Sequence, residues 1–151
     1  MHRSRVALVP VVALLVVACS SGGATSVPAA SASASDSTAQ TRIEVTMTDT
    51  FRFEPAAMSV PVGVPVTFVV TNAGVLDHEF YLGDEAMQAH HEEEMIEMGG
   101  MGHDEPEGIA VEPGETEELT YTFDMPGMML AGCHVAGHYA GGMKADVSVV
   151  E

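Results

Sequence analysis

Residues 119–150 read LTYTFDMPGMMLAGCHVAGHYAGGMKADVSVV, and two patterns in this stretch decide the fold. Apolar residues alternate with polar ones over 119–123 and again over 147–149, a period of two that is typical of strands with one buried face. Between these two runs, residues 131–143 form a glycine-rich loop that contains Cys, His and Met. The stretch therefore predicts strands joined through a loop that carries side chains able to bind metal ions.

The same alternation extends through the preceding part of the chain. It is found over 43–47, 64–71 and 78–82, and each run is short and bounded by Pro, Gly, Asn or Asp. Many short alternating strands separated by turns favour an antiparallel sandwich or barrel. We therefore expect residues 41–151 to form one all-β domain.

The N-terminus reads as an export and anchoring segment. Residues 1–18 combine a positively charged start with about a dozen apolar residues, too few to span a bilayer as a stable helix, and so predict a signal peptide. Cys19 follows directly, as in the lipobox of bacterial lipoproteins, where the thiol becomes lipidated. The alternative is an ordinary signal peptide with an incidental cysteine. Residues 19–40 are mostly Ser, Ala, Gly, Thr and Pro and predict a flexible tether.

Acidic residues dominate the charge of the chain. It has 22 Asp and Glu but only five Lys and Arg, and two of these five lie in the signal segment, which leaves a formal charge of 3 − 22 = −19 after its removal. No basic residue lies between Arg52 and Lys144. This charge argues against a nucleic-acid partner, because affinity for phosphates depends on Lys and Arg. It favours metal ions or basic proteins as partners.

The loop at 131–143 carries three metal-binding side chains at regular spacing. Cys133, His138 and Met143 are five residues apart, and the glycines between them allow all three to turn toward one point. With a second imidazole they would form the His₂Cys set with a weak thioether that suits copper in electron-transfer sites. His78, which opens an upstream strand, is the candidate for that imidazole.

Other chemistries explain this loop less completely. If Cys19 carries lipid, Cys133 has no disulfide partner within the chain, and metal ligation would protect its thiol in an oxidising compartment. Zinc is a weaker alternative metal, because structural zinc sites use four strong ligands and a thioether is not one of them. A nucleophilic Cys133–His138 pair would leave Met143 and the second histidine without a role.

Several further segments resemble the cupredoxins, the blue-copper family that includes plastocyanin and azurin. The resemblance covers nearly the whole domain and rests on FRFEP at 51–55, MSVPVG at 58–63, VTFVVTN at 66–72 and the run from 126 to 133. It implies a Greek-key β-sandwich that holds one type 1 copper ion, cycling between Cu(I) and Cu(II). It also implies that His78, Cys133 and His138 are equatorial ligands and that Met143 is the axial ligand.

Two positions depart from the pattern of this family. Plastocyanin-like and azurin-like members usually have Asn after the first histidine, where it ties the two ligand loops together, but this chain has Glu79. Cys133 is followed by His134, as in multicopper oxidases, yet the paired His-x-His motifs of their multinuclear centre are missing. We therefore expect His134 to face solvent or to be hydrogen-bonded rather than to bind metal.

Residues 84–107 interrupt the strand pattern and predict an insertion. The composition of 84–102 favours a helix that ends at Gly99 and Gly100. At helical spacing, one face would carry Met87, His91, Met95 and Met98. One interpretation is an amphipathic helix whose Met residues and Ile96 pack on the sandwich. The other is a second site, for additional Cu(I), with the candidate donors Met87, His90, His91, Met95, Met98, Met101 and His103.

These features predict a non-enzymatic, monomeric copper protein outside the cytoplasm. We expect it to carry single electrons and to be anchored through lipid on Cys19 to a bacterial membrane, at the cell surface or in the periplasm. The loop around His138 is small and largely apolar, so we expect a redox partner protein to dock there. The alternative function is copper sequestration, delivery or resistance through the insertion at 84–107.

Overall fold

A computed structural model describes residues 41–100 and 102–151 of the chain. The predicted signal segment, Cys19 and the tether up to residue 40 lie outside the described residues, as does Met101. The elements in chain order are β1 (Thr41–Thr48), β2 (Arg52–Glu54), β3 (Ala57–Pro61), β4 (Pro65–Asn72), β5 (His78–Gly83), α1 (Glu85–Glu97), β6 (Gly108–Val111), β7 (Thr116–Thr122), β8 (Gly127–Gly132) and β9 (Lys144–Val150).

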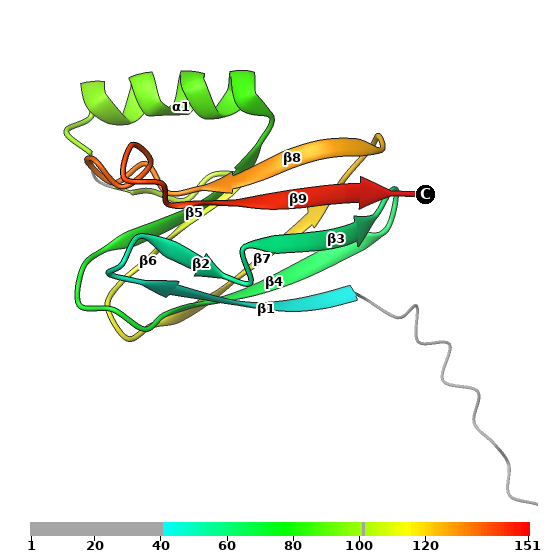
Figure 1. Ribbon diagram of the computed structural model, residues 1–151, viewed down its shortest axis with the longest axis horizontal. Helices are drawn as coiled ribbons and strands as arrows, with labels where there is room; N and C mark the ends of the chain where they lie inside the picture. Colours follow the sequence, from blue (N-terminus) through cyan, green and yellow to red (C-terminus); the bar gives the residue numbers. More distant parts are fainter. Residues whose placement is uncertain (1–40, 101) are drawn as a thin grey trace, which may run out of the picture. The chain divides into compact units, whose positions relative to one another are not determined.

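The strands form the two sheets of a β-sandwich (Figure 1). One sheet has the strand order β2-β1-β4-β7 and the other the order β3-β9-β8-β5-β6. The sandwich expected from the alternating pattern is confirmed, but it is not purely antiparallel. β1 pairs with β4 in parallel, and β3 pairs with β9 in parallel. Both are pairs of strands distant in sequence, so a period-two pattern could not reveal their direction.

The core lies between the sheets and is built from the alternating apolar residues. Aromatic rings from both sheets meet there, with Phe68 5.2 Å from Phe80 and 6.4 Å from Phe123 between ring centroids. The fully buried apolar residues around them include Val45, Met47, Phe53, Val60, Val66, Val70, Leu82 and Val147. Burial of this apolar surface is the main term that stabilises the domain. It also gives the loops at the end of the sandwich a rigid base.

The predicted helix in the insertion is confirmed as α1. Its N-cap is Asp84, whose carboxylate accepts hydrogen bonds from the backbone N–H groups of Ala86 and Met87, both at 2.9 Å. After Glu97 the chain leaves the helix through Gly99 and Gly100, both with positive φ. In the left-handed region glycine carries no Cβ penalty, so this pair is a suitable helix stop.

The helix α1 packs against β5 and β8 on the face of the sheet that points away from the sandwich core (Figure 1). Its buried residues are Gln88, His91 and Met95, so the packed face is largely polar. The interpretation in which Ile96 packs on the sandwich is wrong for this residue, because its exposed fraction is 69%. Within the described residues, no helix is both long enough and apolar enough to cross a membrane.

The strand β5 is buried on both faces because α1 covers its outer side. Phe80 and Leu82 belong to the core between the sheets, whereas Glu79 and Tyr81 lie against α1. The Tyr81 ring stacks on the imidazole of His91 with centroids 3.9 Å apart. This double burial places the strand that begins with His78 between the core and the insertion.

Candidate metal centre

The predicted copper ligands come from two places at one end of the sandwich. His78 is the first residue of β5, while Cys133 directly follows β8 and begins the loop to β9. That loop closes on itself, because the backbone N–H of Met143 donates to the carbonyl of His138 at 3.0 Å and that of Cys133 donates to the carbonyl of Met143 at 3.2 Å. The loop residues are thereby held at the end of the same sheet as His78.

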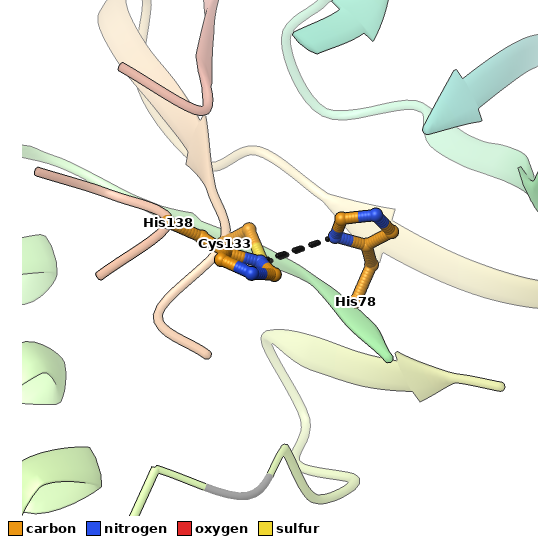
Figure 2. A group of neighbouring side chains, drawn as sticks. All are labelled: His78, Cys133 and His138. Atoms are coloured by element: carbon orange, nitrogen blue, oxygen red, sulfur yellow. Dashed lines mark hydrogen bonds between the residues drawn. The ribbon is translucent and has the colours of Figure 1, made fainter. Parts of the chain in front are cut away.

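The donor atoms of three residues form a compact triangle (Figure 2). The Nδ1 atoms of His78 and His138 are 3.2 Å apart, and Cys133 Sγ lies 3.4 Å from Nδ1 of His138 and 3.9 Å from Nδ1 of His78. All three residues are buried. For metal–nitrogen bonds of about 2.0 Å and metal–sulfur bonds of about 2.3 Å, trigonal coordination separates the donors by roughly 3.5–3.8 Å. The triangle therefore fits one metal ion after shifts of a few tenths of an ångström.

Met143 is placed at the same end of the sandwich. Its side chain is fully buried, it directly precedes β9, and its backbone bonds to both His138 and Cys133, as described above. Two imidazoles, a thiol and a thioether are the donor set that suits copper in electron-transfer sites. The four predicted ligands therefore lie together in the folded domain.

Burial makes this site neutral in the metal-free protein. It raises the pKa of the Cys133 thiol to about 12, although backbone N–H groups, including that of Glu79 at 3.3 Å from Sγ, favour the thiolate. Burial also lowers the pKa values of His78 and His138 below their ordinary value, and in His138 the neighbouring His78 adds to this effect. Imidazoles that stay neutral keep the lone pairs that a metal ion needs.

Asp49 orients His78 from outside the triangle. Its carboxylate accepts hydrogen bonds from the backbone N–H groups of Val75 and Leu76, at 2.9 and 3.2 Å, and these bonds lower its pKa. Its Oδ1 also lies 3.4 Å from Nε2 of His78. A carboxylate behind one ring nitrogen fixes the orientation of the imidazole and points the other nitrogen at the metal position. Sequence reasoning missed Asp49, because nothing in its local sequence connects it with His78.

Phe51 is a second neighbour that the sequence did not indicate. Its ring lies 4.4 Å from the imidazole of His138 between centroids. Its own backbone is in the left-handed region, with φ of 59°. The turn between β1 and β2 therefore packs directly on the ligand loop.

Glu79 joins the two parts of the chain that supply the ligands. It is fully buried, and its Oε2 accepts a hydrogen bond from the backbone N–H of His134 at 3.2 Å. Its Oε1 lies 3.0 Å from Nε2 of His91 on α1. Glu79 thus ties the loops together, as the family's Asn would be expected to do, and links both of them to the insertion.

His134 is buried and hydrogen-bonded, so of its two expected environments the hydrogen-bonded one is confirmed and the solvent-facing one is not. Its Nε2 lies 2.7 Å from Oε1 of Gln88, and its Nδ1 lies 2.5 Å from a carboxylate oxygen of Glu92. The ring stacks on Tyr139 at 4.3 Å. Both polar partners belong to α1, which is why the local sequence around Cys133 could not show that His134 is covered.

Some of the predicted metal donors of the insertion are buried and others are exposed to solvent. On α1, His91 and Met95 are buried, Met87 is half-buried and His90 is exposed. Met98, the C-cap residue after the helix, is exposed as well. His103 lies in the loop after the helix, and Met101 is outside the described residues. His91 instead lies beside two carboxylates that sequence reasoning did not select, those of Glu79 and Glu105.

The fold and the donor set define a copper-binding cupredoxin, and comparison with known proteins agrees. The model of the plastocyanin/azurin family of copper binding proteins matches residues 39–150, and this chain belongs to that family. Its copper centre is of the type 1 class. The family assignment thus rests on sequence similarity as well as on the site.

Individual relatives and solved structures are similar to this chain over most of the domain. The copper-resistant cuproprotein CopI of Pseudomonas aeruginosa is 36% identical over 81% of this chain and 80% of the relative, and CopI of Rubrivivax gelatinosus is 38% identical over 74% and 67%. The reduced auracyanin of Roseiflexus castenholzii matches with a TM-score of 0.66 and 26% identity, covering 74% of this chain and 98% of that protein.

Proposed function

We propose that this protein carries single electrons outside the cytoplasm through one copper ion held by His78, Cys133, His138 and Met143. The observation that supports this most directly is the buried triangle of two Nδ1 atoms and one Sγ. Copper in such a site cycles between Cu(II), which accepts imidazole and thiolate, and Cu(I), which also favours thioether. The protein acts as a carrier rather than as an enzyme.

Rigidity is what the residues contribute to electron transfer. Asp49 holds His78, Glu79 holds the backbone beside Cys133, and Phe51 packs on His138. Because these neighbours restrain the copper ligands, the same ligand positions serve Cu(I) and Cu(II) with little movement. Small movement lowers the energetic cost of gaining or losing an electron.

His138 is the proposed exit for the electron. It is only 6% exposed, but Ala136, Gly137 and Ala140 beside it are small and exposed, so a redox partner protein docks closely over the ring. The insertion limits this surface on one side, because a Cβ at Gly100 would lie 2.9 Å from the Cβ of Ala136. The protein works as a monomer that meets its partner at this end of the sandwich.

The test is spectroscopic and electrochemical. Purified protein loaded with Cu(II) should show intense visible absorption from thiolate-to-copper charge transfer, and voltammetry should show a reversible one-electron couple. Absence of the visible band would refute the type 1 site. A band without a reversible couple would leave a copper site and refute the electron carrier.

Copper handling is the second candidate, and the names of the relatives favour it. The relatives in Pseudomonas aeruginosa, Rubrivivax gelatinosus and Vibrio cholerae are each called a copper-resistant cuproprotein. In this reading Met and His residues of the insertion bind additional Cu(I). Because His90 and Met98 are exposed, the variant His90→Gln/Met98→Leu tests uptake of extra Cu(I) without disturbing the packed face of α1. One copper per chain in the parent protein would reject this candidate.

A further inference from the structure

A second group of metal-binding atoms lies between α1 and the loop that follows it. The Nδ1 atom of His91 is 3.1 Å from Oε1 of Glu105, and Nε2 of His103 is 3.2 Å from the same oxygen. We propose that His91, His103 and Glu105 form a second metal site, for a divalent ion that prefers nitrogen and oxygen ligands, such as Zn²⁺ or Cu²⁺. This proposal is separate from the copper centre and from Cu(I) binding by methionines.

The hydrogen bond between Nε2 of His91 and Glu79 leaves the other ring nitrogen, Nδ1, as a possible metal ligand. Its Nε2 is hydrogen-bonded to Oε1 of Glu79 at 3.0 Å, and an ionised carboxylate accepts hydrogen bonds only. The tautomer with its proton on Nε2 donates to this carboxylate and leaves a lone pair on Nδ1. His91 is 1% exposed, and within the described residues its Nδ1 has no hydrogen-bond partner, although Glu105 is close. A buried lone pair without a protein donor can be satisfied by a bound cation or by a water molecule, and the carboxylate beside it favours the cation.

The carboxylate of Glu105 is in the same condition. Its Oε1 is buried and, in the part of the chain that the structure describes, has no hydrogen-bond partner despite its two histidine neighbours. For bonds of about 2.0–2.2 Å, tetrahedral coordination separates the donors by roughly 3.3–3.6 Å. Glu105 Oε1 lies 3.1 Å from His91 Nδ1 and 3.2 Å from His103 Nε2, and both distances are close to that range. Glu94, with Oε2 3.9 Å from Nδ1 of His91, is placed to add a fourth ligand.

Glu79 holds the His91 ring through the nitrogen that does not face the proposed metal position. A histidine that binds a metal with one nitrogen and donates from the other to a carboxylate is the common arrangement in metalloproteins, since the carboxylate fixes the tautomer and the ring orientation. Glu79 and His91 have this relationship. The stacking of His91 on Tyr81 holds the ring in place as well.

Charge and access also favour a divalent cation. The described ion-pair partners of Glu105 are the two histidines, and the sequence has no Lys or Arg between Arg52 and Lys144 to neutralise the carboxylates. The side chains of Glu105 and His103 are 22% and 42% exposed, so an ion can enter from solvent. Imidazole and carboxylate donors without sulfur suit Zn²⁺ or Cu²⁺ better than Cu(I).

The first experiment measures zinc uptake by the full protein after its copper centre has been filled. Zn²⁺ is added by calorimetric titration and equilibrium dialysis in excess Mg²⁺ at physiological ionic strength, which suppresses loose binding to surface carboxylates. We expect one Zn²⁺ per chain, with the visible copper band retained. Absence of saturable uptake would overturn the proposal.

Variants then locate the ion. His91→Gln changes a buried residue and risks misfolding, so the test uses the partly exposed Glu105→Gln and His103→Gln. Each should weaken zinc binding at least about tenfold, because loss even of an outer partner of a ligand typically has that effect. The control is Glu93→Gln, an exposed carboxylate on the same helix, which should bind as the parent does. Unchanged affinity in both test variants would overturn the assignment, as would loss in the control.

A further experiment with Cu²⁺ identifies the class of ion that the site prefers. Cu²⁺ added to the copper-loaded protein should give a second paramagnetic resonance signal, distinct from that of the type 1 centre, and Glu105→Gln should remove it. Uptake of Cu(I) but of neither divalent ion at these residues would overturn the proposed preference.

Discussion

Glu79 accepts a hydrogen bond from the backbone N–H of His134 across the two strands that deliver the copper ligands, at 3.2 Å. The contact joins the residue after His78 to the residue after Cys133. Glu79 also donates its own backbone N–H to Cys133 Sγ at 3.3 Å. One buried glutamate therefore fixes the spacing of the ligand loops and the hydrogen bonding of the thiolate.

Replacement of Glu79 tests this link. Glu79→Ala leaves the buried N–H of His134 without an acceptor, which costs roughly 1–3 kcal/mol of unfolding free energy. It should also shift the visible copper band and the reduction potential, since outer partners tune a metal site. Urea unfolding and voltammetry measure these effects. Glu79→Gln keeps an oxygen acceptor and should change less; an alanine variant identical to the parent in both measurements would show that the link is dispensable.

Cys133→Ser should abolish the visible colour and the redox couple while the sandwich stays folded. The thiolate supplies the charge-transfer band, whereas stability comes from the apolar core between the sheets. Absorption spectra and thermal unfolding by circular dichroism check the two parts of this expectation. The control is metal-free parent protein, which should also be folded. If both samples were unfolded, the metal would be a structural requirement instead.

Copper affinity should rise with pH. In the metal-free protein burial raises the pKa of Cys133 to about 12 and lowers the pKa values of His78 and His138, so at neutral pH the thiol holds a proton and the imidazoles do not. Binding then releases one proton, and the apparent affinity should increase about tenfold per pH unit above neutrality. Calorimetry in buffers of different ionisation enthalpy counts the protons. A count of zero would mean that the thiolate already exists before copper binds.

Cys19→Ala should release the protein from the membrane fraction. A lipobox without its thiol cannot be acylated, and the remaining signal segment is too short to anchor the chain as a stable helix. Cell fractionation with immunodetection measures the distribution. Cys133→Ser serves as the matched control, because it removes the other cysteine and should stay with the membrane. Unchanged membrane association of Cys19→Ala would refute lipid anchoring through this residue.

The sequence by itself determined the sandwich and the four residues that face the copper position. Alternation of apolar residues is a local pattern that reports strands directly, and Cys133, His138 and Met143 are close enough in sequence for their spacing to carry meaning. His78 could be chosen because it opens a strand and because the donor set lacked one imidazole. The helix in the insertion was also predictable, from its composition and its terminal glycines.

Only the tertiary structure decided what surrounds those ligands. Asp49, Phe51 and Glu79 acquire their roles through contacts between segments distant in sequence, and His134 is buried only because α1 lies over it. The same packing placed His91 beside two carboxylates, those of Glu79 and Glu105. Local patterns report which face of an element is apolar, whereas buried polar contacts depend on which elements pack together, so these partners became visible only in the folded domain.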